Sequence, residues 1–249
     1  LATRLFATRM DRQNSFAATA MRKLAMALES LAPQICRHMQ QSAESMDEST
    51  RVQDPGYLET IRRLTLAWAG QRKALIRHRS ERTGQVNEYT FSPYFIEPYA
   101  IGQTTMLIGL CDPPGQLRTF KIERIEQVEL TREAYEIPAT FNPRVLLADA
   151  WGIWYTDEEP VEVVLRFSPR VARRVKETRW HRSQVIEDQA DGSLIWRGRI
   201  AEPREMLPWV RGWGADVEVL APANIRESVA EEARKMVEVY GGGGKREGG

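Results

Sequence analysis

The arginines of one short stretch, residues 117–125 (LRTFKIERI), have the type and spacing most suggestive of chemistry. The stretch has the β-branched and aromatic content of a strand, yet four of its nine residues are charged. Because alternate side chains of a strand share a face, two arginines are predicted to flank two apolar residues on one side of the sheet. These four residues are Arg118, Phe120, Ile122 and Arg124. Guanidinium groups clamp phosphates through paired hydrogen bonds, so this face is a candidate anion site.

The segment around this stretch combines cations with aromatic rings. Between Gln71 and Ile125 there are eight Lys or Arg residues and five acids, interleaved with six aromatic residues. Small barrels use this combination to bind single-stranded nucleic acid or nucleotides. On composition alone, the commoner interpretation is a solvated strand edge, or an ion pair of an arginine with a neighbour such as Glu123. The sequence leaves both interpretations open.

Familiar signatures of catalysis and metal binding are absent from the sequence. HExxH, CxxC, GxSxG, GxxxxGK(S/T) and GxGxxG do not occur. The three histidines, His38, His78 and His181, lie on three different segments, and no pair of carboxylates stands out from the solvated surface. We therefore expect a protein that is not an enzyme and that needs no cofactor or metal.

Composition and charge narrow the class of protein. The 249 residues suffice for one large domain or two small ones, and 42% hydrophobic and 28% charged residues are ordinary for a globular chain. The net charge of +1 gives no global basic field for duplex DNA, so any nucleic-acid surface must be local. Two distant cysteines, no membrane-spanning run and no signal peptide predict a cytoplasmic location.

Residues 1–70 are predicted to be helical. Apolar spacing predicts helices over 15–31 and 34–46, followed by a polar linker, ESMDESTRVQ. Pro55 then begins a third helix, which ends at Gly70. The chain opens at Leu1 in helical rhythm and without an initiator methionine, so we expect it to start partway through a larger protein.

Residues 71–140 change to the pattern of strands. The segments ALIRHRS, VNEYTFS, PYFIEPYAI and TTMLIGLC precede LRTFKIERI, which QVELTREAYEI extends. About five short strands with no helix between them predict a small antiparallel β-barrel. The open mouth of a small barrel can hold a cation in contact with water.

The rest of the chain predicts an α+β domain. Residues 141–160 form a junction with a short helix and the tryptophans Trp151 and Trp154, which we interpret as packing or interface residues. Over 161–240 the predicted order is βαββαβα, a ferredoxin-like sandwich with an added helix, in which Ser168 caps the first helix. The glycine-rich tail, 241–249, is expected to be a flexible end.

Two segments resemble a known family. The stretch SPYFIEPYAIGQTTMLIGLCDPPGQLRTFKIERIEQVEL resembles the core of the WYL domain, an Sm-like or SH3-like five-stranded barrel found in bacterial transcription regulators. Its matching features include the proline-led strand at Pro98, Gly102 in the turn and the pattern R-x-F-x-x-x-R-I that starts at Arg118. Residues 161–222 resemble the C-terminal extension called WCX. Residues 18–33 are similar to the helical linker that follows the winged helix-turn-helix of those regulators.

The resemblance implies a ligand pocket on the barrel. In it, Arg118 and Arg124 recognise an anionic effector such as single-stranded DNA or a nucleotide. The family's namesake triad falls on Thr105, Met106 and Leu107, and the tyrosine usual on the first strand falls on His78, so both positions depart from the family pattern. The implied ligand-binding set is His78, Arg79, Tyr94, Thr105, Arg118, Lys121 and Arg124.

The resemblance also implies a function. The leading hypothesis is the ligand-sensing regulatory region of a bacterial transcription regulator, a homodimer that reaches duplex DNA through a winged helix-turn-helix expected to be missing from this chain. No membrane partner is expected. The alternative is an accessory nucleic-acid-binding module of a defence or CRISPR-type effector system.

Overall fold

The computed structural model of the chain describes residues 15–49, 55–99 and 104–241. The chain divides into two compact units, Leu1–Thr140 and Phe141–Gly249, and each is described by itself. Within the described ranges, none of the helices has the length and apolar run that crossing a membrane requires.

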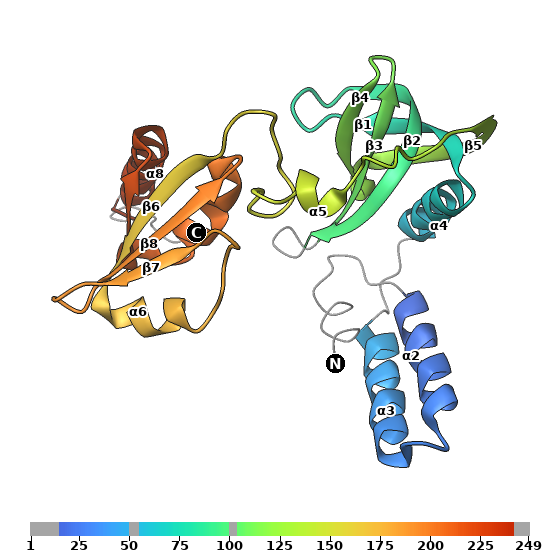
Figure 1. Ribbon diagram of the computed structural model, residues 1–249, viewed down its shortest axis with the longest axis horizontal. Coiled ribbons are helices and arrows are strands. Elements are labelled where there is room, and N and C mark those ends of the chain that lie inside the picture. The colour runs from blue at the N-terminus through green and yellow to red at the C-terminus, as the bar shows by residue number, and fades with distance from the viewer. Residues whose placement is uncertain (1–14, 50–54, 100–103, 242–249) are drawn as a thin grey trace, which may run out of the picture. The chain divides into compact units, whose positions relative to one another are not determined.

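The first unit begins with a pair of helices, α2 (Ser15–Leu28) and α3 (Pro33–Ser49), which lie side by side (Figure 1). Their shared core is built from small and flexible side chains: Ala18, Met21, Ala43 and Met46. The polar linker predicted from Glu44 is therefore wrong in its first half. Because Met46 packs against α2, the helix continues through these polar residues to Ser49.

The barrel follows the next helix, α4 (Pro55–Ala69). The helix buries Tyr57, Thr60, Leu64 and Ala67, and this spacing of three and four residues forms one face against the strands. Five antiparallel strands curl beside it in the order β4-β3-β2-β1-β5 (Figure 1). They are β1 (Arg72–Arg79), β2 (Val86–Tyr99), β3 (Thr104–Asp112), β4 (Gln116–Lys121) and β5 (Ile125–Ala134).

Two details of the predicted strands are wrong. VNEYTFS and PYFIEPY form one long strand, β2, whose register shifts between Pro93 and Phe95, because proline cannot donate to the ladder and a bulge accommodates it. The last two residues of the predicted strand, Ala100 and Ile101, lie outside the described residues. Residues 117–125 are not one strand, since a 3-10 turn, η1 (Ile122–Arg124), separates β4 from β5. The turn lets Ile122 and Ile125 both enter the core, whereas residues three apart on an extended strand would face opposite sides.

The second unit is the predicted α+β sandwich. Its four-stranded antiparallel sheet has the order β7-β8-β6-β9, in which β6 (Val161–Phe167) and β7 (Val185–Asp188) flank β8 (Leu194–Ile200). With β9 (Val217–Ala221) this is the order of the split βαβ arrangement, so the predicted fold class is confirmed. The remaining elements are α5 (Pro143–Leu146), α6 (Pro169–Lys176), η2 (Pro203–Met206), α7 (Leu207–Arg211), η3 (Gly214–Asp216) and α8 (Ala223–Gly241).

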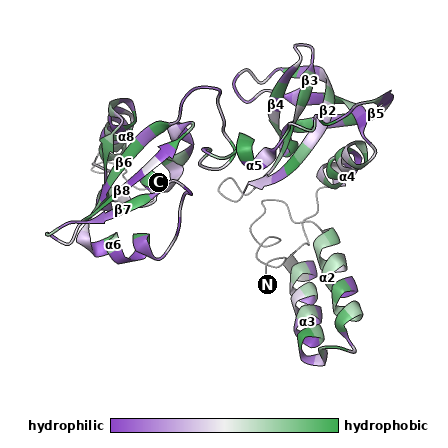
Figure 2. Cartoon of the chain, viewed as in Figure 1, coloured by the Kyte–Doolittle hydropathy of each residue, from purple (hydrophilic) through white to green (hydrophobic). Residues whose placement is uncertain are grey.

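The core of this unit is aromatic. Trp196 is fully buried on β8, and Trp209 makes ring contacts with four other tryptophans and with Phe167. Trp151 is buried in the same cluster, whereas Trp154 is about half exposed. Figure 2 shows the opposite character on α6, which is mostly hydrophilic. Its arginines, Arg170, Arg173 and Arg174, are exposed.

A buried carboxylate holds the junction to this core. Glu205, 3% exposed, accepts hydrogen bonds from the backbone N–H groups of three consecutive residues. The donors are Gly152 at 2.9 Å, Ile153 at 2.7 Å and Trp154 at 3.1 Å. These bonds satisfy backbone N–H groups of a turn that lies outside the strands and helices.

Candidate anion-binding site

The site is built around the ring of Phe120, which is buried at the end of β4. Its centroid lies 4.7 Å from the ring of His78 on β1, and 5.3 Å from the rings of Tyr89 and Phe91 on β2. Arg118 lies two residues before Phe120 on the same face of β4, and its guanidinium lies over the Tyr89 ring at 5.7 Å. Three strands therefore bring one cation and one imidazole to the edge of a single aromatic cluster.

Arg124 approaches the cluster from the η1 turn. Its Nη2 lies 2.7 Å from Oε2 of Glu81, which belongs to the turn between β1 and β2. Burial lowers the pKa of His78, and the positive charge of Arg124 lowers it further. The pairing of an arginine with Glu123, which the sequence left open, is not what the structure has. Glu123 instead accepts hydrogen bonds from the Thr104 hydroxyl and the Thr105 N–H.

Among the described residues, two cations of β4 lack an acidic partner. Within the described ranges, no carboxylate lies within 4.0 Å of the charged groups of Arg118 or Lys121. Nε2 of His78 is also fully covered and has no hydrogen-bond partner among the described residues. Within the described ranges, the cluster thus keeps a cation, Arg118, that no carboxylate neutralises, which is the arrangement an anionic ligand would satisfy.

The other predicted site residues make contacts away from the cluster around Phe120. Arg79 follows His78 on β1 and so faces the opposite side, where it pairs with Glu126 and donates to the Gly84 carbonyl at 3.0 Å. Tyr94 is buried and stacked on Tyr135 with ring centroids 6.0 Å apart. Thr105 is buried and hydrogen-bonded to the Tyr57 hydroxyl at 3.2 Å. Lys121 follows Phe120 on β4 and so faces away from the cluster. The proposed site is therefore narrowed to His78, Arg118 and Arg124.

The comparisons with known proteins identify both units. The family model of the WYL domain matches residues 59–130, and that of the WCX domain matches residues 159–237. The chain belongs to the proteins that join a WYL domain to a WCX domain. The matched segments are the barrel with most of α4, and the α+β sandwich with most of α8.

One curated relative and two solved structures are similar to the chain. An uncharacterized HTH-type transcriptional regulator of Bacillus subtilis, YobV, is 25% identical over 141 residues, which are 54% of this chain and 42% of the relative. A crystal structure of a CRISPR Cas-related protein aligns with a TM-score of 0.53 at 11% identity, covering 84% of this chain and 60% of that one. Proteasome accessory factor B/C of Arthrobacter aurescens aligns with a TM-score of 0.36 at 18% identity, covering 87% and 34%.

Sequence reasoning missed two residues of the WYL site. Tyr89 supports the Arg118 guanidinium, and its place two residues before the buried Phe91 on β2 is the signal that could have put it on the same face. Glu81 could not be found this way, because it lies in a turn whose conformation no periodicity describes.

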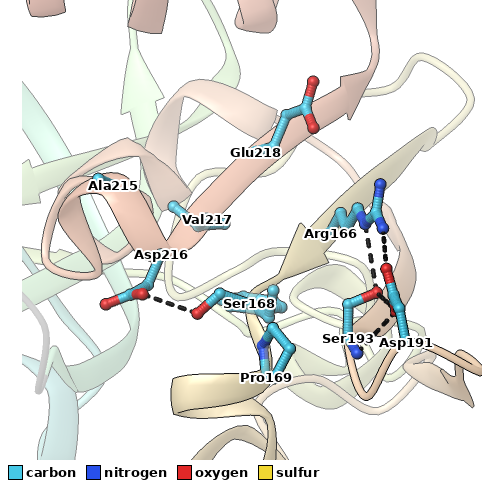
Figure 3. A pocket seen from close by; sticks show the side chains of 10 residues that line it. Arg166, Ser168, Pro169, Asp191, Ser193, Ala215, Asp216, Val217 and Glu218 are labelled. Atoms are coloured by element: carbon cyan, nitrogen blue, oxygen red, sulfur yellow. Dashed lines mark hydrogen bonds and ion pairs between the residues drawn. The ribbon is translucent and has the colours of Figure 1, made fainter.

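A hollow of about 270 Å³ lies in the WCX domain, where the end of β6, the start of α6 and the start of β9 meet (Figure 3). Its charged side chains already have partners: Arg166 pairs with Asp191, Asp216 with Arg170, and Glu218 with Arg226. Ser168 stands at the N-cap of α6 as predicted, but its hydroxyl donates to Asp216 at 2.7 Å and accepts no capping hydrogen bond from the N–H groups of α6. Because these charged side chains of the hollow already form ion pairs, the hollow is a poorer ligand site than the barrel.

The part of the chain that the structure describes contains no group of three or more His, Cys, Asp or Glu side chains that could hold a metal ion. The chemistry of the barrel site is that of anion recognition by guanidinium and aromatic groups.

Proposed function

We propose that this chain is the ligand-sensing regulatory region of a bacterial transcription regulator, and that its WYL barrel binds an anionic effector, single-stranded nucleic acid or a nucleotide. The observation that carries the proposal is Arg118, whose guanidinium lies on the Tyr89 ring without a carboxylate partner in the described ranges. A cation beside aromatic faces suits phosphates that are followed by bases.

The similarity to an HTH-type transcriptional regulator supports the regulatory role. The matched part is 42% of that relative, so the DNA-binding activity of a whole regulator is part of the proposal. In this scheme, duplex DNA is bound by a helix-turn-helix domain of the full-length regulator in the cytoplasm, and the WYL and WCX domains report the effector to it.

The preferred nucleic acid tests the proposal. We expect the chain to bind a labelled single-stranded oligonucleotide of about 12 nucleotides more tightly than the same sequence as a duplex, because exposed bases can stack on the aromatic cluster only when they are unpaired. Fluorescence anisotropy at moderate salt measures both affinities. Tighter, sequence-specific binding of the duplex would contradict the proposed ligand class.

We also propose that the regulator is a homodimer, which uses α2. Trp151, interpreted from the sequence as a packing or interface residue, is buried within its own unit. However, Leu24 of α2 is 50% exposed, Leu31 in the turn after α2 is 79% exposed, and Figure 2 shows that α2 consists mostly of hydrophobic residues. Large apolar side chains around a core of Ala and Met leave a surface that a second copy of the helix pair would cover.

Sedimentation tests the dimer. We expect the wild-type chain to sediment as a dimer at micromolar concentration, and the double variant Leu24→Asp/Leu31→Asp as a monomer, because a charge buried in an apolar interface is strongly unfavourable. Val145→Asp is the control, since Val145 is similarly exposed but lies on α5. A monomeric wild-type chain, or a dimer that survives the double change, would contradict this role of α2.

A further inference from the structure

The turn between β1 and β2 places an acid on the proposed anion site. Backbone hydrogen bonds close the turn, from Ser80 N–H to the Gln85 carbonyl and from Gly84 N–H to the Ser80 carbonyl, both at 2.8 Å. The turn is therefore an ordered support for Glu81. The Glu81 side chain is 73% exposed, yet its carboxylate reaches the Arg124 guanidinium at 2.7 Å.

The contact between Glu81 and Arg124 has the chemistry of ligand binding. A carboxylate and a phosphate oxygen accept the same hydrogen bonds from a guanidinium, so both cannot occupy the same edge of it. The two arginines of the site consequently differ. Arg118 is free of acids in the described ranges, whereas Arg124 carries an acid supplied by the protein itself.

We propose that Glu81 is an internal competitor of the anionic effector, which displaces it from Arg124 on binding. The inference rests on the proposed function, because it assigns a regulation to the same site. Displacement is feasible, since exposed ion pairs of this kind contribute little to stability and are screened by salt. It would also release the β1–β2 turn from η1, so this turn is the part of the barrel whose contacts depend on whether the effector is bound.

The test is a charge-removing substitution in the full chain, Glu81→Gln. We expect this variant to bind a labelled single-stranded oligonucleotide roughly 1.5-fold to fivefold more tightly than wild type, the range that removal of an exposed competing pair allows. The gain should shrink as salt is raised, because salt already screens the pair. Glu133→Gln is the matched control, since Glu133 is 67% exposed and pairs with Lys73 near the other end of β1. It should bind as wild type does.

A second background isolates the contact. In Arg124→Ala, the change Glu81→Gln should bring no gain, because the group for which acid and effector compete is gone. Equal gains from Glu81→Gln and Glu133→Gln would mean that overall charge is responsible and would overturn the inference. So would a gain that persists without Arg124, or no gain in the wild-type background.

The proposed function can fail separately. If no oligonucleotide binds, the five proteins are titrated with inorganic phosphate, which needs only the guanidinium. A gain by Glu81→Gln for phosphate would then keep the internal competitor and reject nucleic acid as the effector. The absence of a gain with either probe would reject Glu81 as an internal competitor. Oligonucleotide binding that depends on Arg124 would still support the proposed function.

Discussion

The change Glu205→Ala is expected to destabilise the WCX domain by about 3–5 kcal/mol. The carboxylate accepts three backbone N–H groups, and alanine would leave these donors without their partner in a largely buried turn. Hydrogen bonds to a charged group each stabilise by about 1.5–3 kcal/mol, and buried donors left unsatisfied cost about 1–3 kcal/mol each. The sum is reduced because Gly152 and Trp154 can be partly rehydrated.

Tryptophan fluorescence is a suitable measurement of this effect. Six of the seven tryptophans lie in the second unit and only Trp68 lies in the first, so the signal reports the unfolding of the WCX domain. A fall in Tm of about 10 °C or more is expected for a unit of this size. Glu205→Gln should be less destabilised, because its amide oxygen can keep some of the bonds. Glu227→Ala, at an exposed position on α8, should change stability by about 0.5 kcal/mol or less.

An equal, small effect of Glu205→Ala and Glu227→Ala would show that the junction does not depend on this carboxylate. The WCX fold would then be held by its aromatic core alone, and the turn at residues 152–154 would be free to change its conformation without cost to the domain.

The order of the elements could be predicted from the sequence because local patterns decide it. Alternation in VEVVLRF places Val163, Leu165 and Phe167 on the buried face of β6, and the proline that begins α6 marks where the strand gives way to a helix. Such local signals predict the element correctly because the residues that form it also pack its buried face. The barrel strands could be predicted for the same reason.

The site could be predicted only in part, because it depends on contacts between distant segments. Arg118 and Phe120 share a face of one strand, which alternation predicts. Arg124 reaches the cluster only through the η1 turn, which burial of Ile122 and Ile125 imposes, and its partner Glu81 lies 43 positions earlier in the sequence. The hydrogen bonds between Glu205 and residues 152–154 also join segments that are far apart in the sequence. No local pattern distinguishes that glutamate from the other acids.

The changes Arg118→Ala and Arg124→Ala are expected to weaken binding of the anionic effector by about tenfold to a hundredfold. Each removes a charge-assisted hydrogen bond worth about 1.5–3 kcal/mol. The dependence of affinity on salt should also flatten, by about 0.7 in log–log slope for each phosphate of a single strand that the variant no longer binds. Arg118→Ala should weaken binding more than Arg124→Ala. Arg124 must first give up its ion pair with Glu81, so its contact with the ligand contributes less net binding free energy.

Folding should change little in both variants, and this separates ligand binding from a structural role. Arg118 contributes a cation–π contact at a partly exposed position and Arg124 an ion pair with the exposed Glu81, each worth about 1 kcal/mol or less. Arg77→Ala is the matched control: it removes the same charge from β1, where Arg77 is exposed and donates to the Gln127 side chain at 3.4 Å. Its affinity should stay within about twofold of wild type, because a distant charge acts only through the screened field. Unchanged affinity of the Arg118 and Arg124 variants, with a clear fall in Tm, would mean that these arginines stabilise the barrel and that the effector binds elsewhere.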